Sequence, residues 1–168
     1  MKARHLRFGM NLWPPFLGAG IRVRHIAEDW SEAIVELRQG LMNRNYVGTH
    51  YGGSLFSMTD PFYALMLMHR LGPRYLVWDQ AASIEFLAPG RGTVRAVFAL
   101  SGERVEAIRA DAAAGEKVLP DFDVEIRDSG GELVARVHKT LYVRLKPRFR
   151  PGDGSLQARV HESGGEAL

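Results

Sequence analysis

From residue 54 to residue 71 the chain reads SLFSMTDPFYALMLMHRL, a segment that is apolar nearly all round when it is drawn as a helix. A helix with this profile is buried on most of its circumference. Pro61 lies inside the segment and lacks the N–H that a continuous helix needs, so the helix must bend there. The sequence therefore predicts one buried helix over residues 53–71, bent between residues 57 and 61, which Gly72-Pro73 ends.

Segments on both sides of this helix alternate apolar and polar residues, the pattern of strands with one buried face. They cover residues 21–25, 33–38, 75–87, 91–101, 122–126 and 133–145. A turn at residues 27–29 is expected to join the first two strands as a hairpin, and a turn at residues 88–90 is expected to join the next two strands. Helices are predicted over residues 3–13, where Pro14-Pro15 ends the helix, and over residues 103–117.

These elements predict an α+β fold in which a curved antiparallel sheet is wrapped around one long apolar central helix. A repeated alternation of strand and helix is missing, which excludes a Rossmann fold. We expect a single domain over residues 1–147, with an N-terminal helical segment at residues 1–19. Residues 148–168 are rich in Pro, Gly, Ser and charge and are predicted to form a disordered tail.

The composition excludes several classes of protein. The chain has 168 residues and no Cys, which rules out a disulfide scaffold, a Cys nucleophile and zinc–thiolate or iron–sulfur sites. A net charge of +3 is too small to indicate nucleic-acid binding. The longest apolar run, residues 61–68, is far shorter than the ~20 residues of a membrane helix, and the His spacing indicates no metal site. We expect a cytoplasmic protein with no nucleic-acid, membrane or metal partner.

Basic residues concentrate near the two ends of the chain. The group nearer the C-terminal end of the chain consists of Lys139, Arg144, Lys146, Arg148 and Arg150. Such a group can bind an anionic ligand such as a nucleotide phosphate, but it is more often a solvated face. We therefore expect these side chains to lie in solvent.

A glycine-containing loop before the central helix carries the most informative motif. It reads Asn45-Tyr46-Val47-Gly48-Thr49-His50-Tyr51-Gly52-Gly53, and Asp60 follows it on the helix. The segments at residues 83–90 and 128–145 add to the motif. In order and spacing these residues resemble the hotdog-fold thioesterases, in particular the phenylacetyl-CoA-type and tetrameric acyl-CoA thioesterase groups. The mark of those groups is Asn-x-x-Gly-x-x-His-Gly-Gly, followed after six residues by an acidic residue.

The resemblance implies the hotdog fold, hydrolysis of an acyl-CoA thioester and assembly into a homodimer or a homotetramer built as a dimer of dimers. Acyl-CoA is then the substrate, and no cofactor is required. The motif histidine stands at His50, one residue before its place in the family, and Tyr51 occupies that place. Because a shift of one residue turns a side chain in another direction, the role of the family histidine is assigned to neither residue.

The chemistry of thioester hydrolysis can also be assigned from the residues. The reaction needs N–H donors for the developing oxyanion and a carboxylate that activates water or attacks directly. The candidate catalytic residues are Asp60 as the carboxylate, the Gly52 and Gly53 amides as oxyanion donors, and Asn45 beside them. The candidate substrate-binding residues are His50, Tyr51, Asp79, Gln80 and Arg91.

The spacing of two of these residues bears on the assembly. Gly52 and Asp60 are eight residues apart, which is about 12 Å along a helix at ~1.5 Å per residue. One thioester carbon cannot contact both groups within a single subunit. We therefore expect the Gly amide and the Asp to come from different subunits paired about a two-fold axis.

Two other functions and one structural alternative remain open. A hotdog hydratase or dehydratase would use His50 and Asp60 as an acid–base pair on a hydroxyacyl or enoyl thioester. A non-catalytic module would bind acyl-CoA without cleaving it. Asp60 followed by Pro61 also has the pattern of a helix N-cap, in which case residues 54–59 would be irregular.

Overall fold

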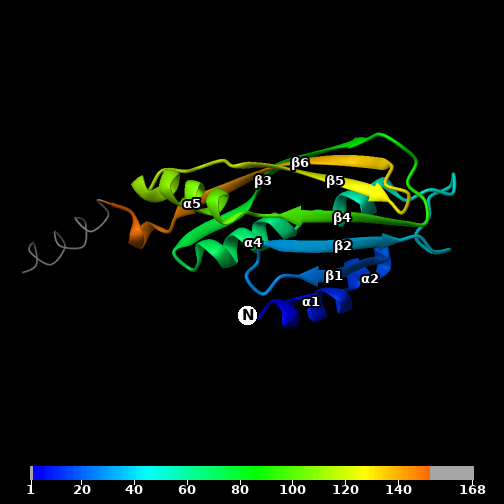
Figure 1. The fold of residues 1–168 in the computed structure, drawn as a ribbon, viewed down its shortest axis with the longest axis horizontal. Helices are drawn as coiled ribbons and strands as arrows, with labels where there is room; N and C mark the ends of the chain where they lie inside the picture. Colours follow the sequence, from blue (N-terminus) through cyan, green and yellow to red (C-terminus); the bar gives the residue numbers. More distant parts are fainter. Residues whose placement is uncertain (1, 152–168) are drawn as a thin grey trace, which may run out of the picture.

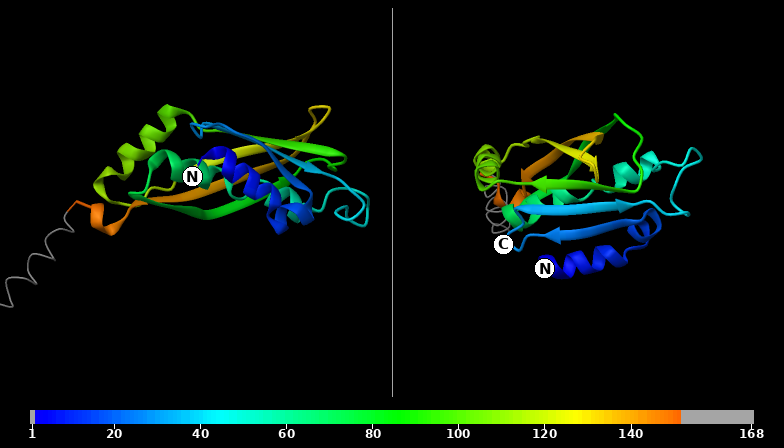
Figure 2. Two further views of the ribbon diagram at one scale, coloured as in Figure 1. Left: turned by 90° about the horizontal axis from the view of Figure 1, so that it is seen from below. Right: turned by 45° about the vertical axis from the view of Figure 1, so that its right-hand side comes forward.

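Six antiparallel strands form one curved sheet in the order β1-β2-β4-β5-β6-β3 in a computed structural model that describes residues 2–151 (Figure 1). The strands are β1 Ile21–Ile26, β2 Glu32–Arg38, β3 Tyr75–Phe86, β4 Thr93–Ala99, β5 Asp121–Asp128 and β6 Leu133–Leu145. The helices are α1 Ala3–Leu12, α2 Pro14–Ala19, α3 Gly52–Ser57, α4 Phe62–Leu71 and α5 Gly102–Asp111, with 3-10 turns at Ala112–Ala114 and Pro147–Phe149. The curvature of the sheet is visible when it is seen from below (Figure 2).

The predicted curved antiparallel sheet is confirmed, but the central helix is not continuous. α3 ends at Ser57 and α4 begins at Phe62, so the prediction of one helix over residues 53–71 is wrong. Pro61 has no N–H, and the residue before a proline is pushed away from helical geometry, so the chain breaks here instead of bending. The N-cap alternative for Asp60 is also wrong, because residues 54–57 are helical and the N-cap of α4 is Pro61.

The strands on either side of residues 88–90 do not pair with each other. β3 lies at the edge of the sheet against β6, and β4 lies between β2 and β5. The connecting segment is fixed from two directions: the Leu87 and Ala88 amides donate to the Val134 carbonyl, and the Gly90 carbonyl accepts from the His50 amide. This segment therefore passes beside the loop that precedes α3.

The N-terminal helical segment consists of two helices, and one other helix is shorter than expected. α1 ends at Leu12 before Pro14-Pro15, as predicted, and Pro14 then begins α2, since proline is well suited to the first position of a helix. The helix predicted over residues 103–117 ends at Asp111 and continues only as a short 3-10 turn. Most of the predicted tail, residues 152–168, lies outside the described residues.

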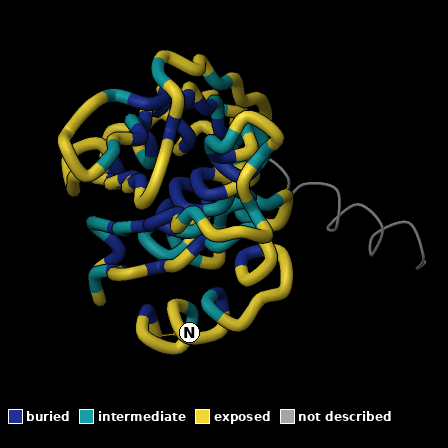
Figure 3. Tube along the Cα trace, turned by 90° about the vertical axis from the view of Figure 1, so that its right-hand side faces the viewer, coloured by how far each residue is buried: buried dark blue, intermediate teal, exposed yellow. Residues whose placement is uncertain are grey.

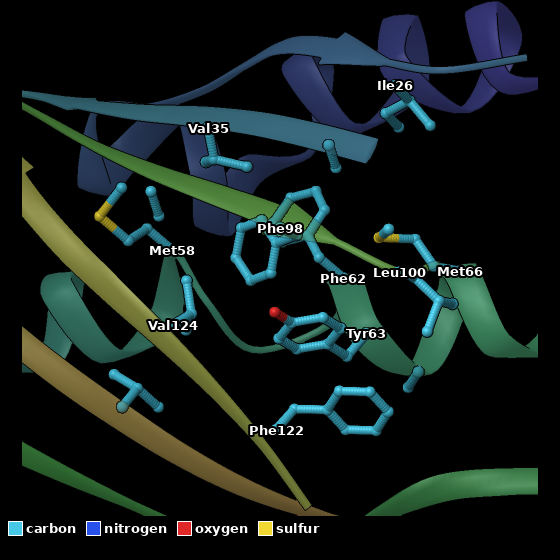
Figure 4. Close-up of a cluster of buried hydrophobic side chains, with 14 of the residues drawn as sticks. Ile26, Val35, Met58, Phe62, Tyr63, Met66, Phe98, Leu100, Phe122 and Val124 are labelled. Atoms are coloured by element: carbon cyan, nitrogen blue, oxygen red, sulfur yellow. The ribbon is translucent and has the colours of Figure 1, made fainter. Parts of the chain in front are cut away.

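The core lies between the concave face of the sheet and α4. Tyr63 and Phe62 point from α4 into a cluster of aromatic rings (Figure 4), with the Phe62 and Phe98 ring centroids 4.9 Å apart and those of Tyr63 and Phe122 4.5 Å apart. The burial colouring shows the same interior, with the loops exposed around it (Figure 3). No helix of residues 2–151 is long and apolar enough to cross a membrane.

Candidate functional site

A cleft of about 530 Å³ opens between the loop at residues 45–52 and the segment at residues 86–91. Four of the residues predicted from the sequence line it, namely Asn45, His50, Gly52 and Arg91. Apolar side chains supply much of the remaining lining, from Val47, Leu55, Phe86 and Leu87. The cleft therefore combines an apolar wall with a few polar groups, as is common for small-molecule sites.

Asn45 organises the loop that forms one side of the cleft. Its Oδ1 accepts from the Thr49 amide at 3.0 Å, and its Nδ2 donates to Thr49 Oγ1 at 2.8 Å and to the His50 carbonyl at 3.1 Å. Both hydrogens of the carboxamide are thus used within the loop. In this arrangement Asn45 holds the backbone at His50 in place and has no free donor for a substrate.

His50 is buried at the base of the cleft, with 3% of its surface exposed. Its Nε2 lies 3.1 Å from the Gly92 carbonyl, which requires the proton on Nε2 and leaves Nδ1 as an acceptor. Among residues 2–151 no donor reaches Nδ1. Burial lowers the pKa of His50, so the imidazole is neutral near pH 7.

Two exposed aromatic side chains lie close to the Cα atoms of Gly52 and Gly53. A Cβ at Gly52 would lie 2.9 Å from Phe86 Cζ, and a Cβ at Gly53 would collide with the Tyr51 ring. Tyr51 itself is mostly exposed and does not line the cleft. Within the described part of the chain neither the Gly52 nor the Gly53 amide donates a hydrogen bond, so both N–H groups are free.

Asp60 lies outside the cleft, in the turn between α3 and α4, where it meets a lysine from the sheet. Lys139 Nζ on β6 is 3.6 Å from Asp60 Oδ1 and 2.9 Å from Asp79 Oδ1 on β3, and it donates to the Asp60 carbonyl. The Lys139 side chain is 0% exposed, whereas the Asp60 side chain is 64% exposed. The expectation that Lys139 lies in solvent is therefore wrong.

Asp79 reaches this lysine because of an irregularity in β3. The strand register shifts between Asp79 and Ala81, which leaves Gln80 unpaired and lets Asp79 face the interior. Burial raises the pKa of Asp79, and the Lys139 ammonium beside it acts in the opposite direction. Gln80 is exposed and belongs neither to the cleft nor to the lysine cluster.

The predicted residues thus separate into two groups within one subunit. The cleft holds Gly52 and His50 but has no Asp or Glu in its lining among residues 2–151, and Asp60 with Asp79 lies at Lys139. No cluster of three or more His, Asp or Glu side chains in the described residues is arranged to hold a metal ion. Sequence reasoning missed Lys139 and Phe86, although the alternation of the two long strands places both on the inner face.

Comparison with protein families gives a match over most of the chain. Residues 2–143 match the family described as a domain of unknown function, DUF4442. Comparison with curated protein sequences gives no match.

Solved structures give the architecture. PA5026 from Pseudomonas aeruginosa, described as a protein of unknown function and probable thioesterase, is 21% identical with a TM-score of 0.73 over 86% of this chain and 94% of that chain. The thioesterase HI1161 from Haemophilus influenzae is 15% identical with a TM-score of 0.63 over 86% and 92%. The E. coli PaaI protein from the phenylacetic acid degradation operon is 19% identical with a TM-score of 0.56 over 86% and 91%. The chain therefore has the expected α+β hotdog fold.

Proposed function

Since the chain belongs to the DUF4442 family and shares the hotdog fold with proteins described as thioesterases, we propose that it hydrolyses acyl-CoA thioesters. The observation that carries the proposal is the presence of two features on either side of α3. The free Gly52 amide, at the start of α3, opens onto a cleft with an apolar wall, and the Asp60 carboxylate, in the turn that follows α3, is held beside a buried ammonium. These are the two parts that thioester hydrolysis requires.

In the proposed reaction the acyl group lies against Phe86 and Leu87, with the thioester oxygen at the Gly52 and Gly53 amides. Asp60 accepts a proton from water as the water oxygen attacks the carbonyl carbon, or it attacks that carbon itself to form an anhydride that water then cleaves. In the first route the carbon–sulfur bond breaks after water has attacked, and the thiolate takes the proton from Asp60. In the second route it breaks as the anhydride forms, and the thiolate takes the proton that the cleaving water releases. In both routes the thiol leaves as free CoA. The products are one carboxylic acid and one thiol, and no cofactor takes part.

The two groups meet if two subunits form each site. β3 lies at the edge of the sheet, and its outer edge has no partner strand among the described residues. Asp60 is placed beside this strand by the Lys139 contact to Asp79. A second copy that pairs with β3 about a two-fold axis covers the exposed edge and brings its own cleft toward Asp60. We therefore propose a homodimer, or a homotetramer formed from two such dimers.

The substrate-binding roles follow from the placement of the side chains. Arg91 is exposed at the rim of the cleft, where a guanidinium can bind a CoA phosphate. His50 lines the base of the cleft, but its Nδ1 is buried, so its role in the proposed site is to hold the Gly92 carbonyl through Nε2. Tyr51 and Gln80 are exposed outside the cleft and would contact substrate only across the subunit boundary. The cytoplasmic location stays a prediction.

A panel of acyl-CoAs tests the proposal and its alternatives in one experiment. Release of free thiol is followed with a thiol-reactive dye, and consumption of an enoyl-CoA is followed by its ultraviolet absorbance. We expect thiol release from at least one aryl or aliphatic acyl-CoA. Hydration without thiol release would instead support a hydratase, and binding without either reaction would support an acyl-CoA-binding module.

A further inference from the structure

The buried ammonium of Lys139 takes no part in the bond-making and bond-breaking steps of the proposed hydrolysis. We propose that Lys139 is a positioning residue that fixes the Asp60 carboxylate for reaction, an inference that rests on the proposed function. Three features of the molecule support this role: the burial of Lys139, the break in the central helix, and the contacts of one ammonium with two parts of Asp60.

Burial of Lys139 is the first observation. Its side chain is 0% exposed on a strand whose neighbouring inward residues, Val137 and Leu141, are apolar and fully buried. A buried ammonium is costly unless it is paired and hydrogen-bonded. Among the described residues its ion-pair partners are only Asp60 and Asp79, so these two aspartates account for its burial.

The helix break is the second observation. The backbone bonds of α4 begin with the Leu65 N–H, which reaches back to the Pro61 carbonyl at 2.9 Å. The carbonyl of the preceding residue, Asp60, would be left without a helical partner, and it accepts from Lys139 Nζ instead. A buried carbonyl without a partner is destabilising, so Lys139 stabilises the broken conformation of the chain.

The third observation is that the same ammonium contacts both the main chain and the side chain of Asp60. Nζ donates to the Asp60 carbonyl and lies 3.6 Å from Asp60 Oδ1, with Asp79 Oδ1 on its other side at 2.9 Å. The main-chain contact fixes the Asp60 backbone, and the ion pair favours one orientation of a side chain that is otherwise 64% exposed. The ion pair directs Oδ1 to the lysine and leaves Oδ2 for the attacking water. Fixed placement of a reacting group is worth roughly 10²-fold in rate per ångström.

Variants that remove both buried charges separate positioning from simple charge balance. Lys139→Met alone strands the Asp79 carboxylate, whereas Lys139→Met with Asp79→Asn leaves no buried charge and should fold. Asp79→Asn alone is the reference, because it removes the same carboxylate and keeps the ammonium on Asp60. Leu141→Met, an equally buried neighbour on β6, controls for a changed side chain in this strand.

We expect kcat of the double variant to fall roughly 10²-fold below that of Asp79→Asn, with KM changed by less than about threefold. Amide hydrogen exchange at Thr59 and Asp60 should be at least tenfold faster in the double variant than in Asp79→Asn. A double variant with the kcat and the exchange rates of Asp79→Asn would overturn the proposal. Leu141→Met should keep both properties of the wild type.

A measurement on the wild-type protein also tests the proposal, and it depends neither on enzymatic activity nor on the folding of a variant. In the wild-type protein, NMR cross-relaxation should connect the Lys139 ε-methylene protons with the Asp60 β-methylene protons, and its absence would refute the contact. If the wild type releases no thiol from any acyl-CoA, the proposed function fails while cross-relaxation and exchange still decide the role of Lys139. If thiol is released but the double variant matches Asp79→Asn, only the role of Lys139 fails.

Discussion

Replacing Lys139 with Met should destabilise the protein strongly at neutral pH and weakly in acid. The substitution leaves the Asp79 carboxylate, whose side chain is only 29% exposed, without the ammonium that lies 2.9 Å away. Breaking a buried pair in this way costs about 3–5 kcal/mol. The lost bond to the Asp60 carbonyl adds roughly 1 kcal/mol, since part of that loss is recovered by water.

Protonation of Asp79 sets an upper limit to the charge part of this cost. An unpaired Asp can escape by binding a proton, and from an unfolded pKa of about 3.9 this costs roughly 5 kcal/mol at pH 7.5 and roughly 2 kcal/mol at pH 5.5. Burial raises the pKa of Asp79 in the folded state, and removal of Lys139 raises it further. A raised pKa of an acid contributes stability below the unfolded pKa and loses it as the pH rises through the folded pKa. The variant is therefore least stable at neutral pH.

Urea denaturation followed by tryptophan fluorescence at pH 7.5 and pH 5.5 measures this difference. The double variant Lys139→Met, Asp79→Asn is the matched control, and its free energy of unfolding should differ from that of the wild type by the same small amount at both pH values. The reasoning is refuted if Lys139→Met costs less than about 1 kcal/mol at pH 7.5, or if its cost is equal at the two pH values.

Three further outcomes are expected. Asp60→Asn should fold normally and lower kcat by roughly 10²–10⁴-fold, the usual scale of lost acid–base assistance, and an unchanged kcat would remove Asp60 from the mechanism. Light scattering should give a mass of at least twice 18.8 kDa, and a stable, active monomer would contradict a site shared between subunits. Glu36 is buried, and its carboxylate lies 3.3, 3.4 and 3.0 Å from the guanidinium groups of Arg24, Arg38 and Arg95. Burial alone would raise the pKa of Glu36, but the three guanidinium groups outweigh burial and lower this pKa. Glu36→Gln should therefore lower the free energy of unfolding by about 1–3 kcal/mol at pH 7. Urea denaturation should show that this loss becomes smaller as the pH falls through the folded pKa of Glu36.

The strands could be predicted closely because one face of each is buried. β6 was expected at residues 133–145 and spans Leu133–Leu145, and the first hairpin also lies where alternation placed it. Alternation identifies the buried face of a strand but says nothing of its neighbour. The pairing of β3 with β6 instead of β4 therefore could not be read from the pattern.

The central helix shows where local rules stop being sufficient. Pro61 identified the position of the disturbance, but a bend and a complete break differ in how many backbone groups lose their partners. The break is tolerated because a donor from a distant strand, Lys139, satisfies the Asp60 carbonyl. No local pattern near residue 60 contains this donor, so its effect on the helix could not be predicted locally.

The loop motif led to the residues of the cleft but not to their roles. Asn45, His50 and Gly52 do line one cavity, as the spacing suggested. The roles depend on hydrogen-bond partners that are remote in sequence, such as the Gly92 carbonyl that fixes the tautomer of His50. The carboxylate belongs to another place in the subunit because the chain leaves the cleft along α3 before it reaches Asp60.

Lys139 could have been found from the sequence by combining alternation with charge. Val137, Leu141 and Val143 occupy the inward positions of a strand that was predicted correctly, and Lys139 has the same parity. An inward lysine on a buried strand requires a carboxylate partner, because an unpaired ammonium is not stable in a core. Treated as one more basic residue near the end of the chain, it was assigned to solvent. Lys139 and its partner carboxylate Asp79 must therefore change together, so a protein of this fold with an apolar residue at the position of Lys139 should have no buried Asp at the position of Asp79.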